Sequence, residues 1–179
     1  MKVHNRCLAL LGAWLLAGLS ACGWQLQGAR RVPEHLSPLY LDLSDEHSPF
    51  AQVLSQRLRE AGVNVTADRS RAQAVLSVGN DAGGHNVSSV SALNEPQQYE
   101  VFYNVSYRLD LQDAGKVNVL PPQALGASRT MSYDKTLALA KLREERALRD
   151  MLAAELADQV LRRLSMLPDS QSVQADDSP

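Results

Sequence analysis

The sequence predicts an α/β domain, because stretches with strand periodicity and stretches with helix periodicity both occur in it. Residues 39–43 alternate between leucine and polar or aromatic side chains, which is the period of a strand with one buried face. A helical pattern over 49–61 and an apolar stretch over 74–78 complete a strand, helix, strand unit, which is typical of parallel pairing. A long alternating strand over 99–112 and a helix over 136–167 follow.

The start of the chain has the organisation of an export signal. Lys2 and Arg6 form a basic start, Cys7–Leu19 is an apolar segment of 13 residues, and Leu19-Ser20-Ala21-Cys22 closes it. The apolar segment is too short for a bilayer, which needs about 20 residues. The closing residues resemble the lipobox of bacterial lipoproteins, and the resemblance implies removal of residues 1–21 and a diacylglyceryl group on the Cys22 sulfur. The alternative is ordinary secretion with a free cysteine.

The composition of the remaining chain indicates one domain and excludes some kinds of partner and site. Removing 21 of 179 residues leaves 158, the usual size of one domain. The signal takes two of the 18 Lys and Arg residues and none of the 20 Asp and Glu residues, so the net charge becomes −4. A net acidic chain is a poor partner for nucleic acid. Cys7 leaves with the signal and Cys22 carries the lipid, so we expect no disulfide and no cysteine metal site.

Three parts are predicted in the mature chain. Residues 22–38 lack a sustained period and hold two prolines, so we expect a lipidated tether. Residues 39–167 contain the periodic elements and form a single domain, while the acidic residues 168–179 are expected to be disordered. Within the tether, Trp24 either lies at the membrane interface or packs, with Leu26, on the domain's own sheet.

Both ends of the first helix are marked in the sequence. Ser48 is a suitable N-cap, Pro49 suits the first helical position because its missing N–H has no partner there, and Gly62 can end the helix with a positive φ. Between them, apolar side chains recur at helical spacing and predict one buried stripe: Phe50, Val53, Leu54, Leu58 and Ala61.

The middle of the chain contains the strongest strand. The polar stretch Asn80–Pro96 cannot bury much surface, so we expect a mobile loop or a hairpin end there. Residues 99–112 alternate apolar and polar side chains with one exception on the polar face. Residues 113–116 are expected to form a turn and 117–133 the returning strand, which the pair Pro121-Pro122 restricts to an edge or a bulge.

The last helix is predicted to bury a broad stripe, because large apolar side chains are spaced by four: Leu148, Leu152, Leu156, Val160 and Leu164. Its carboxylates alternate with arginines, which is typical of a solvated, ion-paired face. Nothing in the sequence indicates an enzyme. His35, His47 and His85 have no second ligand at metal-binding spacing, and no nucleotide-binding or nucleophile motif occurs. We therefore predict no catalytic residue, no metal and no cofactor.

Several short segments, taken in order, resemble one family of bacterial lipoproteins. They are Cys22-Gly23-Trp24-Gln25-Leu26, Val32-Pro33, Leu58-Arg59-Glu60-Ala61-Gly62-Val63, the tyrosine-rich strand from Tyr99, and Leu137-Ala138-Leu139-Ala140-Lys141. With these segments the chain resembles the LPS-assembly lipoprotein family LptE, also called RlpB, over about residues 22–167. No single motif is diagnostic, and the ordered set carries the resemblance.

The resemblance implies a mixed sheet of about four strands with two helices packed on one face, in a protein that is not an enzyme. It also implies a lipid anchor in the outer membrane, and Gly23 after the lipidated cysteine agrees with that destination by resemblance to lipoprotein sorting. Members of the family sit as a plug in the lumen of the β-barrel LptD, assist its assembly, and bind lipopolysaccharide on its way to the cell surface.

Lys141 matches a family position implicated in lipopolysaccharide binding, and a compact ammonium suits a phosphorylated headgroup. Lys135, Arg129 and Arg143 are near it in the sequence and are further candidates. The alternative for Lys141 is a plain solvated residue at the helix start. The family can also carry a basic residue in the loop before the long strand, whereas Ser89–Leu93 offers none, which argues against a two-point phosphate clamp.

A rival function from another class is that of an outer-membrane lipoprotein with the same α/β build that acts as pilot for a different secretion barrel, or as a structural tether to peptidoglycan. The partner that co-purifies separates the hypotheses: one very large β-barrel for the LptE family, and a ring-forming secretin for a pilot.

Overall fold

The computed structural model describes residues 32–112 and 118–168. The predicted signal, the predicted lipidation site Cys22, most of the predicted tether with Trp24, the turn over 113–116 and nearly all of the predicted tail lie outside the described residues. No helix among the described residues is long and apolar enough to cross a membrane.

One mixed sheet organises the molecule, with strand order β2-β1-β3-β4-β5. Its strands are β1 Leu39–Leu43, β2 Val65–Thr66, β3 Ala74–Val90, β4 Pro96–Leu111 and β5 Asn118–Ser132. Strand β1 pairs in parallel with β2 and β3, and the remaining pairs are antiparallel. The predicted mixed sheet is confirmed, although its strand count was one too low because the two-residue β2 was not predicted.

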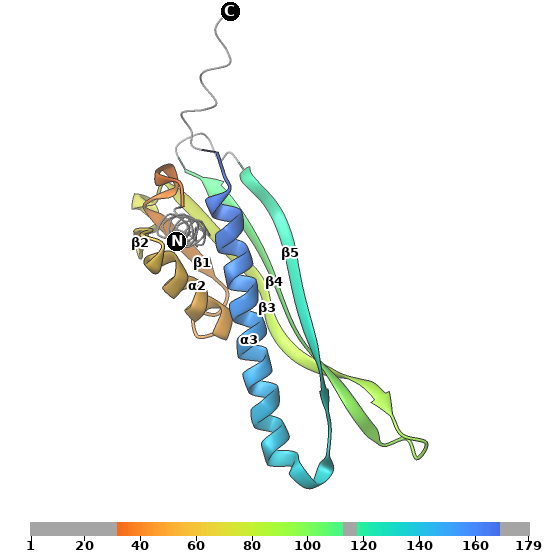
Figure 1. Cartoon of the computed structure of the whole chain (residues 1–179). Helices are drawn as coiled ribbons and strands as arrows, with labels where there is room; N and C mark the ends of the chain where they lie inside the picture. The colour runs from red at the N-terminus through yellow and green to blue at the C-terminus, as the bar shows by residue number, and fades with distance from the viewer. Residues whose placement is uncertain (1–31, 113–117, 169–179) are drawn as a thin grey trace, which may run out of the picture.

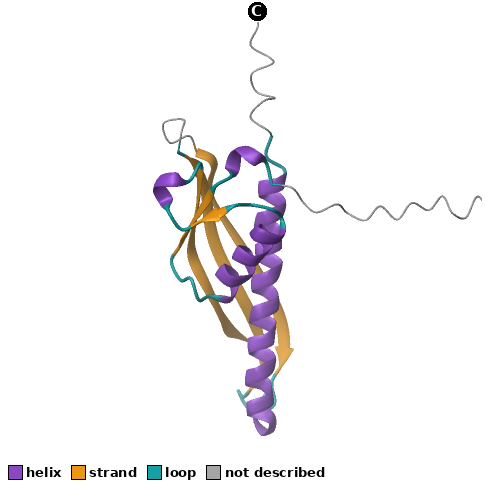
Figure 2. Cartoon of the chain, turned by 90° about the vertical axis from the view of Figure 1, so that its left-hand side faces the viewer, coloured by secondary structure: helices purple, strands orange, loops and turns teal. Residues whose placement is uncertain are grey.

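Two helices, α2 Pro49–Glu60 and α3 Ala138–Ser165, pack on one face of this sheet, as predicted (Figures 1 and 2). The three short 3-10 turns are η1 Glu34–Leu36, η2 Arg69–Arg71 and η3 Lys135–Leu137. We call the uncovered side of the sheet the open face. The β3–β4 hairpin turn and the β5–α3 connection lie together at one end of the molecule, which we call the distal end (Figure 1).

The ends of α2 form as the sequence predicts. The Ser48 hydroxyl oxygen accepts a hydrogen bond of 3.0 Å from the Ala51 N–H, which satisfies one of the donors that a helix start leaves free. After the helix, Gly62 adopts φ +82°, a conformation that glycine reaches without steric cost. These two residues set the length of α2 and direct the chain back into β2.

The core lies where α2 and the C-terminal half of α3 cover the sheet. Twelve large side chains are almost fully buried: Phe50, Leu36, Leu39, Leu54, Leu58, Leu76, Leu109, Leu152, Leu156, Leu164, Val101 and Val105. The predicted alternation of β4 is confirmed, since its apolar residues from Val101 to Leu109 face the helices while Asn104 and Arg108 are exposed on the open face. Leu36 belongs to η1, so the last part of the predicted tether packs into the domain.

Of the two alternatives for Asn80–Pro96, the hairpin end is confirmed and the mobile loop is wrong, because β3 continues to Val90 and pairs with β4 up to the turn. A β-bulge explains the error. Gly79 pairs with Ser106 and Ala82 with Asn104, so β3 contains one residue more than β4 in this interval. Residues at even positions face the helices before the bulge, and residues at odd positions face them after it. The alternation therefore breaks in the sequence although the strand continues.

The expectation for the proline pair was correct. Strand β5 is an edge strand, and Pro121 and Pro122 lie at a register shift between the pairs Tyr107–Gln123 and Leu109–Leu120. A proline has no N–H to donate to a ladder hydrogen bond. The bulge of β5, which inserts one residue relative to β4, therefore lies at the prolines, where such hydrogen bonds cannot form. The bulge lets Leu120 and Leu125 both face the helices.

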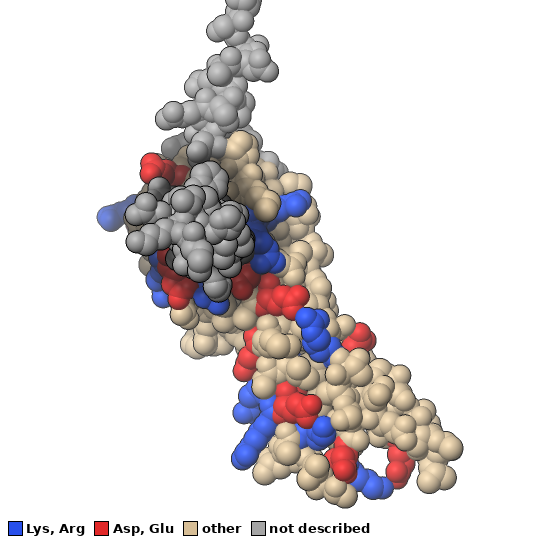
Figure 3. Space-filling view, viewed as in Figure 1, with Lys and Arg blue, Asp and Glu red and all other residues tan. Residues whose placement is uncertain are grey.

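The two halves of α3 differ in burial. The C-terminal half carries the seven buried residues of the helix, whereas Leu139 and Leu142 in the N-terminal half are 66% and 59% exposed. Acidic and basic side chains are interspersed over this end of the molecule (Figure 3). Where α2 no longer covers the sheet, α3 therefore packs on it without a hydrophobic core of its own.

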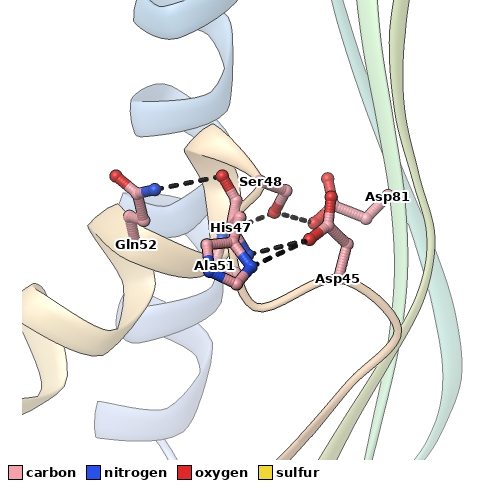
Figure 4. Close-up of polar contacts among 6 residues, drawn as sticks. All are labelled: Asp45, His47, Ser48, Ala51, Gln52 and Asp81. Atoms are coloured by element: carbon pink, nitrogen blue, oxygen red, sulfur yellow. Dashed lines mark hydrogen bonds and ion pairs between the residues drawn. The ribbon is translucent and has the colours of Figure 1, made fainter.

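A polar cluster joins the β3 bulge to the start of α2 (Figure 4). Asp81 lies in the bulge, and its two carboxylate oxygens accept hydrogen bonds from the Ser48 hydroxyl and, at 2.6 Å, from the Tyr103 hydroxyl. Burial raises the pKa of Tyr103, and the hydrogen bond to Asp81 raises this pKa further. The cluster thus connects three elements that lie far apart in the sequence.

We expect Ser48→Ala to lower the free energy of unfolding by about 1–2 kcal/mol, because the change removes the N-cap and one hydrogen bond to Asp81. The matched control is Ser55→Ala in the middle of the same helix. That change should be neutral or slightly stabilising, since alanine has the higher helix propensity. Urea denaturation measures both, and equal effects of the two substitutions would contradict the assigned role of Ser48.

Candidate functional site

A cavity of about 230 Å³ lies near the distal end, between the N-terminal half of α3 and the sheet. Its lining comes from β3, β4, β5, the segment after β5, and α3: His85, Tyr99, Met131, Tyr133, Ala138, Lys141, Leu142 and Glu145. Lys141 is the one predicted site residue among them. The cavity combines a mostly apolar wall with a few polar groups, which is the usual composition of a small-molecule site.

Aromatic side chains form the sheet side of the cavity. The rings of His85 and Tyr99 meet edge to face at 4.9 Å between centroids, and those of Tyr99 and Tyr133 at 5.0 Å. Edge-to-face pairs of this kind hold rings in fixed orientations. Three rings from three successive stretches of chain therefore make a continuous apolar floor.

Lys141 and Glu145 face this floor from α3, because residues four apart lie on one side of a helix. The side chain of Lys141 is 15% exposed, and its Nζ lies 2.9 Å from Glu144 Oε2 and 3.2 Å from Ser132 Oγ. Both partners are exposed residues, so the ammonium remains close to water. An anionic ligand group can reach Lys141 by displacing Glu144, whose carboxylate is about half exposed.

A second group of polar contacts surrounds Glu145, which also lines the cavity. Glu145 Oε1 lies 3.0 Å from His85 Nδ1 and 3.5 Å from the terminal guanidinium nitrogen of Arg149. The Glu145 side chain is largely buried. These contacts, together with that of Lys141 to Ser132, attach the N-terminal half of α3 to the sheet through polar groups.

The other three predicted basic residues do not line the cavity. Lys135 pairs with Glu95 in the hairpin turn at 2.9 Å, and Arg129 pairs with Glu155 at 3.0 Å. Glu155 is 14 residues from Lys141, which corresponds to about 21 Å along the helix. Arg143 is exposed, and residues two apart on a helix do not share a face.

Sequence reasoning missed His85, Tyr99, Tyr133 and Glu145 as a group. His85 fell within the predicted loop because the bulge before it shifts the alternation of β3. Tyr99 was identified only as the start of a strand, and Glu145 as part of a solvated face. The pairing of Val87 with Tyr99 and of Tyr99 with Met131 is the signal that places them together, and it is available only from the register.

The geometry supports binding of an amphiphile with an apolar portion and an anionic group. The aromatic side chains can pack against the apolar portion, and the Lys141 ammonium can bind the anionic group. Within residues 32–112 and 118–168, no three His, Cys, Asp or Glu side chains lie close enough to hold a metal ion.

A family model described as LptE, lipopolysaccharide-assembly, matches residues 36–164, which is most of the chain. The chain belongs to the LptE family. It is 28% identical over 98% of its length to the LPS-assembly lipoprotein LptE of Pectobacterium atrosepticum, of which it covers 96%. It is 25% identical over 90% of its length to that of Yersinia enterocolitica, of which it covers 76%.

Solved structures support the LptE family fold. Rare lipoprotein B of Shewanella oneidensis superposes with a TM-score of 0.61 at 24% identity, over 75% of this chain and 96% of that one. Uncharacterized lipoprotein B of Nitrosomonas europaea superposes with a TM-score of 0.65 at 20% identity, over 80% of this chain and 90% of that one. At these identities the likeness concerns the fold alone.

We expect Gly83→Ala to destabilise this LptE-family domain by about 1–3 kcal/mol, through overpacking between β3 and α3. A Cβ at Gly83 would lie 2.7 Å from the buried Tyr103 ring and 3.2 Å from Arg149 Cδ. Gly84→Ala is the matched control, because its Cβ would point to the open face and meet the partly exposed Phe102 ring at 3.0 Å. Gly84→Ala should be close to neutral, and equal losses in thermal unfolding would contradict the close approach at Gly83.

Proposed function

We propose that this chain is an outer-membrane lipoprotein of lipopolysaccharide assembly, which binds lipopolysaccharide and serves as plug and assembly factor of the LptD β-barrel. Membership of the LptE family carries the proposal. Two relatives that share about a quarter of its residues over nearly the whole chain bear the name LPS-assembly lipoprotein. The lipid on Cys22 anchors the protein to the inner leaflet, with more than one acyl chain for stable attachment.

The distal cavity supports the lipopolysaccharide part of the proposal. Lipid A combines acyl chains with phosphate groups, and the cavity offers aromatic side chains beside an ammonium. Leu139 and Leu142 are exposed next to Lys141, so apolar surface continues outward from the cavity. Of the four basic candidates, Lys141 is the one in the cavity wall, and we assign the phosphate contact to it.

The open face supports the plug. On β4 it carries Glu100, Asn104, Ser106 and Arg108, and the neighbouring positions of β5 are occupied by small residues from Ala124 to Thr130. Polar and small side chains suit water, and they equally suit the polar lumen of a large outer-membrane barrel. A sheet face about 16 residues long and free of helix in the described part of the chain can lie flat against such a wall.

Lys141→Asp should reduce lipopolysaccharide binding several-fold without abolishing it, because exposed ion contacts are individually weak. Arg143→Asp is the matched control: it makes the same charge change two residues away, outside the cavity. Binding to the purified, folded variants is measured at low and at physiological salt, because screening weakens surface attraction. If both variants lose the same amount of lipopolysaccharide affinity, binding depends on the general positive charge of this region and not on a site at Lys141.

A photo-crosslinking side chain at Asn104, Ser106 or Arg108 should capture LptD in cells, since these positions lie along the open face. The same cells without irradiation are the control. Capture of LptD supports the plug. If the lipidated, outer-membrane protein captures no LptD at any of the three positions, or captures a ring-forming secretin, the plug reading fails and the pilot hypothesis replaces it.

A further inference from the structure

The edge of the sheet beside β1 is only partly covered. Strand β2 has two residues, which pair with Leu39 and Tyr40. Among the described residues, no strand pairs with Leu41–Leu43 on this side, although β3 pairs with all three on the other. An uncovered edge presents free backbone N–H and C=O groups that favour pairing with a further strand.

The backbone of β1 shows which groups are free. The N–H of Leu39 donates to the Asn64 carbonyl at 2.9 Å, so it points to the β2 side. Alternate residues of a strand direct their N–H and C=O groups to the same side. The parallel pairing of Tyr40 with Thr66 uses the Leu41 N–H, so three backbone groups face the uncovered edge without a strand partner in the described residues: the Leu41 C=O and the N–H and C=O of Leu43.

The side chains at this edge are also incompletely covered. Leu39, Leu41 and Leu43 all face the helix layer, yet Leu39 is fully buried whereas the other two are only partly buried. A groove of about 690 Å³ runs beside them, bounded by the end of β2 and by the outer side of α2, where Gln52 and Arg59 lie. Leu41 and Leu43 line it on the strand side, where a longer β2 would cover them, and most of its other lining residues are polar.

We infer that residues Trp24–Leu26 of this chain occupy the groove as a sixth strand, paired with β1 beyond the end of β2. The sequence there is Trp24-Gln25-Leu26-Gln27, which has the period of a strand with one apolar face. Paired with Leu41–Leu43, it places Trp24 and Leu26 on the helix side, over the partly covered leucines, and Gln25 on the open face.

Chain length permits this placement. The described chain begins at Val32, which packs against the core, and η1 leads directly into the start of β1. Residues 27–31 span up to about 17 Å when extended, and the distance from the start of β1 to its uncovered part is about 7–13 Å. An antiparallel strand needs the shortest link, since Leu26 then lies beside Leu41 and Trp24 beside Leu43.

The inference rests on the proposed function in one respect, the lipid on Cys22. With Trp24 held at the end of β1, the acyl chains leave the domain two residues away, beside the start of α2. The anchor is then a short, fixed connection at one edge of the sheet. It sets the orientation of the domain to the membrane, which a free tether of 17 residues would leave open.

A disulfide tests the pairing. In either strand direction Gln25 lies opposite Asp42, and opposed residues of paired strands have the Cα separation that a disulfide requires, about 4.4–6.8 Å. The double variant Gln25→Cys, Asp42→Cys is expressed with its own signal and recovered from the outer membrane. The periplasm is oxidising, so we expect most molecules to resist thiol labelling after denaturation and to label fully after reduction.

The control is Gln25→Cys with Glu100→Cys, which places the second thiol on the same face of the sheet about 27 Å farther along β4. If the thiols at positions 25 and 42 label as fully as those of the control, the inference is overturned. A disulfide from either variant to a different protein overturns it as well. The LptD crosslink from the open face is scored separately. A disulfide without LptD capture supports the sixth strand and refutes the plug. LptD capture without the disulfide supports the plug and refutes the sixth strand.

Discussion

The arrangement of this molecule depends on one inserted residue in β3. The bulge between Gly79 and Ala82 changes which positions face the helices, and it turns Asp81 toward the start of α2. A partly buried carboxylate is costly unless its oxygens find donors, and the hydroxyls of Ser48 and Tyr103 supply them. Without the insertion, the residues after it would present the opposite set of side chains to α3. Gly83 and His85 would then face away from the helix that they now contact.

The same insertion separates two regions of different character. On one side lies a core of leucines and valines between α2, α3 and the sheet. On the other, α3 meets β3 through Gly83 and then through the polar contact of Glu145 with His85, beside aromatic rings. Helix α2 starts at the bulge, where Ser48 contacts Asp81, and runs away from this second region, so the position of its start leaves room for the cavity.

Much of the fold could be predicted from local patterns. The caps of α2, the alternation of β4 and the restriction of the proline pair to an edge each follow from the physics of one residue and its neighbours. What failed was any inference across the bulge. The polar residues Asn80 and Asp81 indicate a loop by composition, and only the contacts of Asp81 with Ser48 and Tyr103 explain why they occur within a strand. Lys141 was found by resemblance, whereas its neighbours in the cavity meet only through strand register.

The unequal burial of α3 gives the molecule a gradient of local stability along its length. Local opening costs little free energy where few apolar contacts hold an element, and much where a core does. Residues 138–147 are held by polar contacts at the cavity, whereas 152–164 are held by the core. The distal half of the helix can therefore separate from the sheet while the remainder stays folded. A ligand that fills the cavity shifts this local equilibrium toward closure, so binding at that end orders the helix without any change in the core.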